Sequence, residues 1–212
     1  MKQLKDTLTK EDRNFASLTL LGKVKKNNET ISRILDSGSR DGALLRKAGE
    51  LFDSNQLLSI DWHNRVDNGV EFCSHNLENL LPFSDKYFDL VICNDVLEHI
   101  ELKKQLFNEL LRISGRYLVI SLPNTQHWTY IRGLIRGRMS KQYNFLVEDG
   151  VDRHRWITYY NQNIEFIINN LGSSHSIFGV INTVPTRRVP LWFAKLFKKY
   201  FVFNQVFLLE RH

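Results

Sequence analysis

The sequence has 212 residues, of which 42% are hydrophobic and 25% charged, and its net charge at pH 7 is +6. This length suits one α/β domain with a sizeable core and is too short for two domains of ordinary size. No apolar stretch reaches the roughly 18 residues that a membrane span needs, and the charged N-terminus lacks the apolar core of a secretory signal. We therefore expect a single globular domain over residues 1–212 in a cytoplasmic protein.

The charges are unevenly distributed along the chain. Residues 34–115 hold 8 Lys and Arg against 14 Asp and Glu, whereas the remaining residues hold 21 against 9. This asymmetry indicates either two different ligands on one molecule or an unevenly charged, solvated surface. The two cysteines, Cys73 and Cys93, both lie in strand patterns, which favours reduced core thiols.

Apolar runs that are typical of strands alternate with amphipathic helical patterns. After an N-terminal helical extension over residues 1–30, helices are expected at residues 42–52, 102–113 and 161–172. Such alternation predicts an α/β fold, a Rossmann-like, doubly wound, mostly parallel seven-stranded sheet with helices on both faces. The seven expected strands are residues 31–36, 56–61, 69–74, 87–95, 116–123, 176–182 and 205–210.

Two segments, residues 124–156 and 183–203, fit this alternation poorly and carry basic and aromatic residues. We expect them to cover the substrate side of the sheet. From Pro190 onward the second segment predicts a helix with lysines on one face and apolar residues on the other. That helix would either pack on its own domain or make a peripheral contact with an anionic membrane surface. Its apolar residues are Leu191, Trp192, Leu196, Phe197 and Tyr200.

The junction between the first expected strand and the next helix carries the first indication of a ligand. Gly38 and Gly42 follow that strand, where glycines allow a sharp turn and a close approach to the helix N-terminus, although a plain tight turn has the same pattern. Asp36 ends the first strand and Asp61 ends the second, where an acid can accept hydrogen bonds from ribose hydroxyls. Together they predict a nucleotide-type cofactor. The adjacent Trp62 would lie against its base or pack half-buried.

Four stretches make this prediction specific: "ILDSGSRDGALL", "LLSIDW", "HNLENLLPFSDKYFDLVICNDVLEHI" and "RYLVISLPN". Their order and spacing over residues 31–124 resemble the successive motifs of class I S-adenosylmethionine-dependent methyltransferases, in particular the branch that acts on small molecules. The later stretch "SLPNTQHWTYIRGLIRGRM" resembles the methionine biosynthesis protein W family, in which a Pro-Asn, a Trp and a Gly-Arg-Met recur after the fifth strand.

The resemblance implies S-adenosylmethionine as the cofactor and gives roles to individual residues. It implies that Asp61 binds the ribose, that Trp62 borders the adenine, and that the Leu77 backbone lies beside it. The residues that it places at the methionine end are Asp36, Gly38, Ser39 and Gly42.

Further positions follow from the same resemblance, and two depart from the family pattern. Asn94 and Asp95 would line the methyl-transfer site. The middle glycine of the family's G-x-G-x-G is Arg40 here, and the Asp that usually reads the adenine amino group is Asn76. We expect the Arg40 side chain to point outward and the Asn76 carbonyl oxygen to accept the same hydrogen bond.

Methyl transfer is an in-line displacement, so the enzyme mainly aligns the acceptor and excludes water. An oxygen acceptor also benefits from a base, for which histidine is the usual residue near neutral pH. His99, His127 and His154 are placed for this role. We expect His127 to be the catalytic one, beside Asp95, although a surface or packing role is an alternative for His127 and a structural role for His99.

The basic cover predicts how an acceptor would be bound. Arg132 and Arg136 share a helical face beyond Trp128, and the planar guanidinium suits phosphate or carboxylate. Arg187 and Arg188 would reach the same region from the C-terminal segment. The alternative is a solvated basic helix without a ligand.

These observations predict a methyltransferase for a small polar acceptor, anionic or linked to a glycan or lipid. The rival interpretation is a non-catalytic or regulatory partner of an acyltransferase in methionine biosynthesis. Nucleic acid is disfavoured as a partner because "CNDV" lacks the Asn/Asp-Pro-Pro-aromatic signature of enzymes that methylate base amino groups. The sequence has no nucleophile elbow, no Walker loop and no Cys/His cluster with metal spacing, so no metal is expected.

Overall fold

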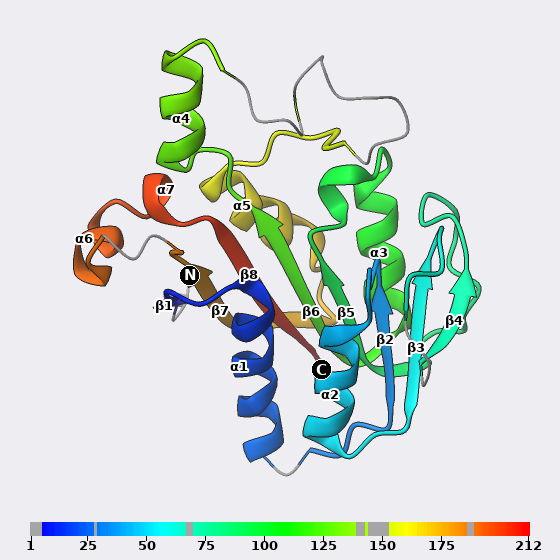
Figure 1. The fold of residues 1–212 in the computed structure, drawn as a ribbon. Coiled ribbons are helices and arrows are strands. Elements are labelled where there is room, and N and C mark those ends of the chain that lie inside the picture. Colours follow the sequence, from blue (N-terminus) through cyan, green and yellow to red (C-terminus); the bar gives the residue numbers. More distant parts are fainter. Residues whose placement is uncertain (1–5, 28, 67–69, 139–142, 144–152, 186–188) are drawn as a thin grey trace.

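The computed structural model describes residues 6–27, 29–66, 70–138, 143, 153–185 and 189–212. These residues form a mixed sheet of eight strands in the order β1-β7-β8-β6-β5-β2-β3-β4 (Figure 1). Neighbouring strands are parallel except that β8 runs antiparallel to both β6 and β7. The strands are β1 (Asp6–Thr9), β2 (Arg33–Ser37), β3 (Gln56–Asp61), β4 (Glu71–Ser74), β5 (Phe88–Asn94), β6 (Ser114–Pro123), β7 (His175–Thr183) and β8 (Asn204–Arg211).

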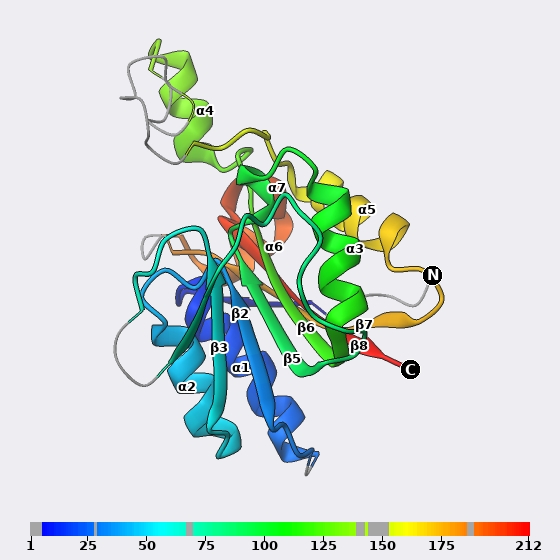
Figure 2. The same cartoon turned by 90° about the vertical axis from the view of Figure 1, so that its right-hand side faces the viewer.

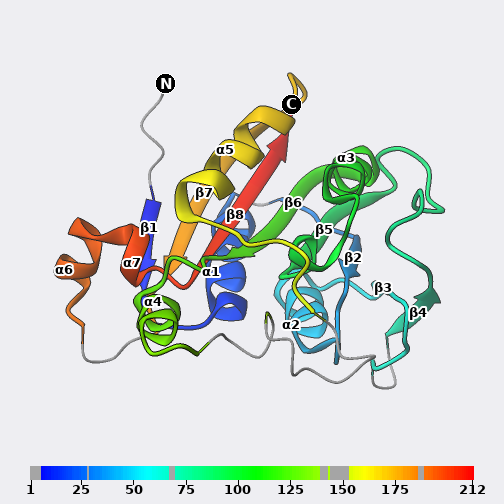
Figure 3. The ribbon, with the colours of Figure 1, turned by 90° about the horizontal axis from the view of Figure 1, so that it is seen from above.

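Helices cover both faces of the sheet. Figures 2 and 3 show α1 (Arg13–Lys26) and α2 (Ala43–Phe52) on one side, and α3 (Lys103–Ile113) and α5 (Tyr160–Asn170) on the other. The remaining helices lie toward the carboxyl ends of the parallel strands (Figure 1). They are the 3₁₀ helix η1 (Leu97–His99) and the α-helices α4 (Trp128–Ile135), α6 (Leu191–Leu196) and α7 (Lys198–Phe201). The expected doubly wound α/β fold is confirmed.

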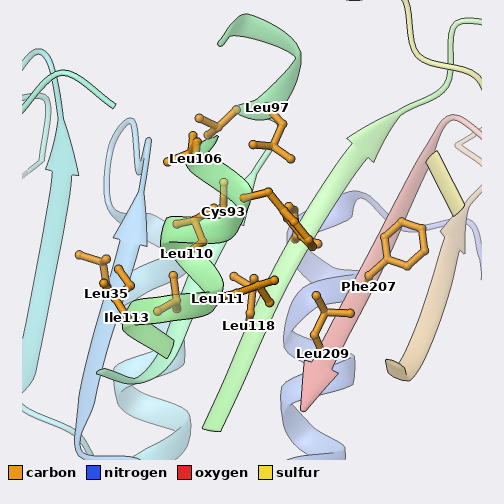
Figure 4. Close-up of a cluster of buried hydrophobic side chains, with 14 of the residues drawn as sticks. Leu35, Cys93, Leu97, Leu106, Leu110, Leu111, Ile113, Leu118, Phe207 and Leu209 are labelled. Carbon is orange, nitrogen blue, oxygen red and sulfur yellow. The ribbon is translucent and has the colours of Figure 1, made fainter. Parts of the chain in front are cut away.

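The core follows from the alternation of side chains along the central strands. On β5, Leu90 and Ile92 face the cluster under α1 and α2, whereas Val91 and Cys93 face the cluster under α3 and α5. A strand that is buried on both faces has an almost continuous apolar sequence, which is why β5 is recognisable from sequence. The α3 side of the core is drawn in Figure 4, which labels Leu106, Leu110, Leu118 and Phe207 among its residues.

The sheet has one strand more than the seven expected. The expected strands correspond to β2 to β8. The additional strand is β1, which pairs parallel to β7 and lies in the N-terminal extension that was expected to be helical. Its four residues, Asp-Thr-Leu-Thr, are too few and too polar to give an alternating pattern. The strand is held by its partners: the Asp6 carboxylate accepts a hydrogen bond from Asn182 (2.9 Å) and pairs with Lys198.

The C-terminal segment also differs from expectation, because it holds two short helices in place of one amphipathic helix. Helix α6 ends at Leu196, Phe197 leaves the helical conformation with φ −123°, and α7 begins at Lys198. The five apolar residues expected on one face are each at least 37% exposed, and the buried contact is made by the small Ala194. No helix in the described part of the chain is both long and apolar enough to cross a membrane.

The order of the strands fixes where a ligand would bind. From β2 the chain moves outward through β3 to β4, and it then returns to β5 on the other side of β2. Ligands of open α/β sheets bind at such a switch point, outside the carboxyl ends of the strands. In this protein the switch point lies between the loops that follow β2 and β5.

Candidate functional site

The loop after β2 requires glycine for two separate reasons. Gly38 has φ +73°, a conformation that other residues rarely adopt. A Cβ atom at Gly38 would lie 2.5 Å from Cγ2 of Val96, which belongs to the loop after β5. The two loops of the switch point therefore touch at this position, and the backbone N–H of Gly38 donates to the Ile60 carbonyl (2.9 Å) at the end of β3.

Arg40 occupies the middle of the glycine motif with φ +57°, and its side chain is exposed. The backbone thus adopts the left-handed turn that a glycine would make, at a cost of roughly 1–2 kcal/mol. Gly42 follows with φ +70° and starts α2, whose first N–H group, that of Ala43, donates to Oδ1 of Asp41 (3.1 Å). The outward direction expected for the Arg40 side chain agrees with its exposure.

Three acids surround this turn. Asp36 is only 3% exposed, and burial, followed by the nearby Asp61 and Asp41, raises its pKa well above the usual value. Beside them, the Ser39 hydroxyl forms a buried hydrogen bond with that of Ser59. A positively charged ligand beside these three carboxyl groups would favour their ionised forms, so the site is suited to such a ligand.

The loops after β3 and β4 lie side by side and form the second part of the site. Oδ1 of Asp61 accepts a hydrogen bond from the N–H of Trp62 (2.6 Å), and the Asp61 carbonyl accepts one from the N–H of His75 (3.0 Å). The Trp62 side chain is 59% exposed, so it does not have the half-buried packing role considered above. Asn76 follows, with Oδ1 accepting from the N–H of Glu78 (3.0 Å), beside the buried Leu77.

The end of β5 is closed by α1, which the sequence did not indicate. Nδ2 of Asn94 donates to Oγ of Ser17 (3.0 Å), and Oδ2 of Asp95 pairs with the Arg13 guanidinium (3.0 Å). Oδ1 of Asp95 accepts hydrogen bonds from Ser121 and from Asn204 (2.9 Å). Asp95, with φ +53°, is thus bonded on both oxygens, and α1 forms a wall of the switch point.

His127 lies deep inside the molecule. It is 2% exposed and begins α4, with Nδ1 accepting from the N–H of Thr129 and bonded to its hydroxyl (2.8 Å). Burial lowers the pKa of His127 to about 4, so the ring is neutral at pH 7. A base with this pKa is weak at neutral pH, and the placement favours the structural alternative. Its catalytic role stays a prediction.

Helix α4 carries the expected acceptor-binding residues away from the sheet. Figures 1 and 2 show it projecting beyond the carboxyl ends of the strands. The Arg132 guanidinium lies over the Trp128 ring (5.7 Å to the centroid), and Arg136 is exposed at the end of the helix. Trp128 and Arg132 are therefore brought together, one helical turn from Arg136. Arg187 and Arg188 lie outside the described residues.

One residue whose role sequence reasoning missed joins the cover to the sheet. Asn124, from the Pro-Asn pair, is fully buried, and its amide donates to the carbonyls of Lys199 (2.9 Å) and Val202 (2.7 Å). Its Oδ1 accepts from the N–H groups of Gln126 and Tyr160 (both 3.1 Å). The signal was the Pro-Asn pair itself, but its partners are distant in sequence.

Comparisons with known proteins agree with this geometry. The family model described as methionine biosynthesis protein MetW matches residues 21–166. The chain belongs to the MetW family. It is 32% identical over 106 residues to the bifunctional methionine biosynthesis protein MetXA/MetW of Rhodopirellula baltica, a match that covers 44% of this chain and 17% of that protein. The chain thus matches less than a fifth of the length of this relative.

Two solved structures show the same fold. An S-adenosylmethionine-dependent methyltransferase from Mesorhizobium loti superposes with a TM-score of 0.59 at 18% identity, over 92% of this chain and 98% of that one. Magnesium protoporphyrin IX methyltransferase from Synechocystis PCC 6803, with bound S-adenosylhomocysteine, gives 0.59 at 15% identity over 94% and 83%. The eight-stranded sheet therefore has the fold of class I methyltransferases.

Proposed function

We propose that the protein binds S-adenosylmethionine and transfers its methyl group to a small polar acceptor. One observation carries the proposal: Gly38 brings the loops after β2 and β5 into contact at the switch point, where the carboxyl groups of Asp36, Asp41 and Asp61 lie near one another. The cofactor carries a sulfonium and an ammonium group, whose positive charges this site is suited to hold. Membership of the MetW family and the likeness to methyltransferases support the same cofactor.

Each loop of the site has a role in this proposal. The turn from Asp36 to Gly42, including Ser39, binds the methionine end, and Asp61 accepts hydrogen bonds from the ribose. Trp62, Asn76 and the Leu77 backbone border the adenine. When bound, the cofactor supplies a methyl group that is attached to a positively charged sulfur, and this sulfur is the leaving group, as a neutral thioether. Asn94 and Asp95 lie at the strand end where transfer takes place.

The acceptor would be held from the cover. Trp128, Arg132 and Arg136 on α4 offer a ring and two exposed guanidinium groups, which suit a small acceptor with a phosphate or carboxylate. Asn124 joins the loop that leads from β6 into α4 to the start of α5 and to the C-terminal segment, and so helps to hold the cover in place. Aligning the acceptor and excluding water are the contributions required for this reaction.

Calorimetric titration with S-adenosylmethionine and S-adenosylhomocysteine tests the cofactor. We expect one binding site, and Asp61→Ala is expected to weaken binding by about 1.5–3 kcal/mol, the value of a hydrogen bond to a charged group. Asp53→Asn is the matched control, since Asp53 lies at the far end of α2, where it pairs with Lys25. Absence of heat and of any thermal shift at millimolar cofactor, or equal weakening by both variants, would contradict the proposal.

A second candidate function rests on the bifunctional relative. In that MetXA/MetW protein the region similar to this chain is joined to a much larger part. This arrangement favours a regulatory or non-catalytic partner of an acyltransferase in methionine biosynthesis. Pull-down from native extract separates the two candidates: a stoichiometric acyltransferase supports the partner, whereas cofactor-dependent methylation of a fractionated metabolite or glycan pool supports the enzyme.

A further inference from the structure

A cluster of three metal-ligating side chains lies just beyond the switch point. Glu98 and His99 belong to η1, directly after β5, and His154 comes from the segment that precedes α5. One ligand atom from each residue lies within 4.8 Å of the other two. We propose that Glu98, His99 and His154 bind one divalent transition-metal ion, a site that the spacing of the sequence does not reveal.

Backbone hydrogen bonds hold the two segments of the cluster together. The N–H groups of Arg155 and Trp156 both donate to the Glu98 carbonyl, at 2.8 and 3.1 Å. The Trp156 indole N–H donates to the Ile100 carbonyl (2.7 Å). These bonds join the segment that contains Glu98 and His99 to the two residues that directly follow His154. The ligands are therefore brought together by the fold itself, which reduces the ordering that binding an ion would require.

Each imidazole is oriented by an outer partner. Nδ1 of His99 lies 3.0 Å from the Arg153 carbonyl oxygen, which can only accept, so the neutral ring carries its proton on Nδ1 and its lone pair on Nε2. Nδ1 of His154 is bonded to the Tyr143 hydroxyl (2.8 Å). Histidines that ligate metals have such partners on their second nitrogen, which fix the tautomer and the ring orientation.

The donor set indicates the class of ion. Two imidazole nitrogens and one carboxylate oxygen suit Zn²⁺ and neighbouring first-row ions better than Mg²⁺ or Ca²⁺, which prefer oxygen ligands. Glu98 is only 1% exposed, and a carboxylate buried this deeply is stabilised by a nearby positive charge. The centroids of the His99 and His154 rings lie 4.5 Å apart, so both imidazoles can contribute to one site.

Three protein ligands leave a coordination position for another molecule, as in catalytic metal sites. A cavity of about 300 Å³ has Glu98 and Trp156 in its lining, and Val96, two residues before Glu98, touches the Gly38 turn. The ion would therefore lie between the cavity and the methyl-donor site. In that position the ion would bind a hydroxyl or carboxylate oxygen of the acceptor. This assignment rests on the proposed function.

For a hydroxyl acceptor the ion would also serve in place of a general base. Coordination lowers the pKa of the hydroxyl, as it does for metal-bound water, and the released proton passes to solvent. The oxygen then forms a bond to the methyl carbon while the carbon–sulfur bond breaks, and the electron pair stays on the neutral thioether. This route does not depend on His127, which is buried and neutral.

The metal is tested without any acceptor. Protein freed of metal is titrated with ZnCl₂, MnCl₂, MgCl₂ and CaCl₂ by calorimetry, and we expect one equivalent of Zn²⁺ to bind most tightly. His154→Ala is expected to weaken Zn²⁺ binding at least about tenfold. Loss of a residue that only hydrogen-bonds a metal ligand already costs about tenfold or more in metal affinity. His212→Ala, which removes an exposed histidine at the C-terminus, is the matched control.

Two further measurements keep the outcome unambiguous. Glu98→Gln removes the anionic ligand and keeps its shape, and the thermal shift induced by Zn²⁺ shows whether the folded variant still binds. No saturable Zn²⁺ binding, or equal binding by the His154 and His212 variants, overturns the inference. Titration of the same metal-free protein with the cofactor tests the proposed function independently. If the protein binds the cofactor but no metal, only the metal site is contradicted. If it binds metal but no cofactor, only the proposed function is contradicted.

Discussion

The cofactor half of the molecule, residues 33–66 and 70–100, and the described part of the cover, residues 124–138, 153–156, 183–185 and 189–203, are organised by different rules. In the cofactor half the candidate groups lie at or just beyond the carboxyl ends of parallel strands, so that the sheet alone brings Asp36, Asp61 and Asp95 to one edge. In the cover the position of a residue is set by distant partners, as when Asn124 bonds the Lys199 carbonyl 75 residues away.

This difference has an energetic side. The cofactor half stores strain at its turns, where the non-glycine residues Arg40 and Asp95 have positive φ. The cover is instead fixed by hydrogen bonds between segments, and its exposed helices contribute little buried surface. A change at the turns of the first region should act on cofactor binding and stability together, whereas a change of the exposed arginines on α4 should act on the acceptor alone.

The largest effect is expected from Gly38→Ala. The new Cβ would meet Val96 Cγ2 at 2.5 Å in a backbone with φ +73°, so the two loops of the switch point must separate. We expect cofactor affinity to fall by about three orders of magnitude or more, which is roughly 4 kcal/mol. Calorimetry measures the loss of cofactor affinity in the variant, and thermal melting measures the change in its stability.

Gly172→Ala is the matched control for this change. Gly172 has a similar φ of +64° but open space around its Cβ position, so it reports the backbone strain without the clash. Val96→Ala in the Gly38→Ala background should restore part of the lost affinity, because it removes the methyl group that the new Cβ meets. Equal losses in both glycine variants, or no rescue, would mean that loop contact is not what Gly38 provides.

The fold was predictable from sequence wherever the signal was local. Strand β5 is buried on both faces and is recognised from its continuous apolar run. The glycines of the turn, Gly38 and Gly42, directly follow β2. Strand β1 was missed because its pairing with β7 depends on Asp6 meeting Asn182 and Lys198, at separations of 176 and 192 residues. No local pattern carries such information.

The site was predictable to the same extent. The order of acids and glycines at the strand ends predicted which loops meet at the switch point. Arg13 was missed because its partner Asp95 lies far along the chain, and the cluster of Glu98 and His154 was missed because cover and strand end meet only in the folded protein. The C-terminal segment was predicted as one helix because its apolar spacing continues through Phe197, where the structure has the break between α6 and α7.

The next largest effect is expected in the cover. Arg132→Ala combined with Arg136→Ala should leave cofactor affinity unchanged and raise the acceptor's KM at least about tenfold, because one charge-assisted hydrogen bond contributes roughly 1.5–3 kcal/mol. Steady-state kinetics with the identified acceptor measure this split. The control is Lys23→Ala with Lys26→Ala, the same change in charge at the end of α1. A double arginine variant that matches this control, or that loses cofactor and acceptor together, would exclude α4 as the specificity element.

A smaller, pH-dependent effect is expected at His127. Its pKa of about 4 lies below that of the unfolded chain, near 6.5, so the unfolded state takes up the proton first. The stability contributed by the neutral ring is complete above pH 6.5 and is lost as the pH falls toward 4, by about 2 kcal/mol at pH 5. The raised pKa of Asp36 acts in the opposite direction, so the variant must be compared with the parent at each pH.

His127→Ser isolates this contribution, since serine is itself a good helix N-cap. Urea denaturation at pH 7.5 and pH 5 should show a smaller loss of stability in His127→Ser than in the parent, while the exposed His63→Ser behaves like the parent. The same variant tests catalysis. Intact turnover at pH 7.5 would exclude His127 as the general base, whereas loss of turnover with unchanged cofactor affinity would establish it.

The smallest effect is a gain, expected at the position where this chain has Asn76. An aspartate there would accept the adenine amino group's hydrogen bond as a charged acceptor, and it would keep the bond that Oδ1 receives from the N–H of Glu78. Hydrogen bonds to charged groups exceed neutral ones by about 1 kcal/mol, so Asn76→Asp should tighten S-adenosylhomocysteine binding about fivefold. Asn79→Asp adds the same charge three residues on, in the same turn, at an exposed position. If both variants tighten binding equally, general electrostatic attraction is responsible; if neither does, Asn76 does not read the adenine.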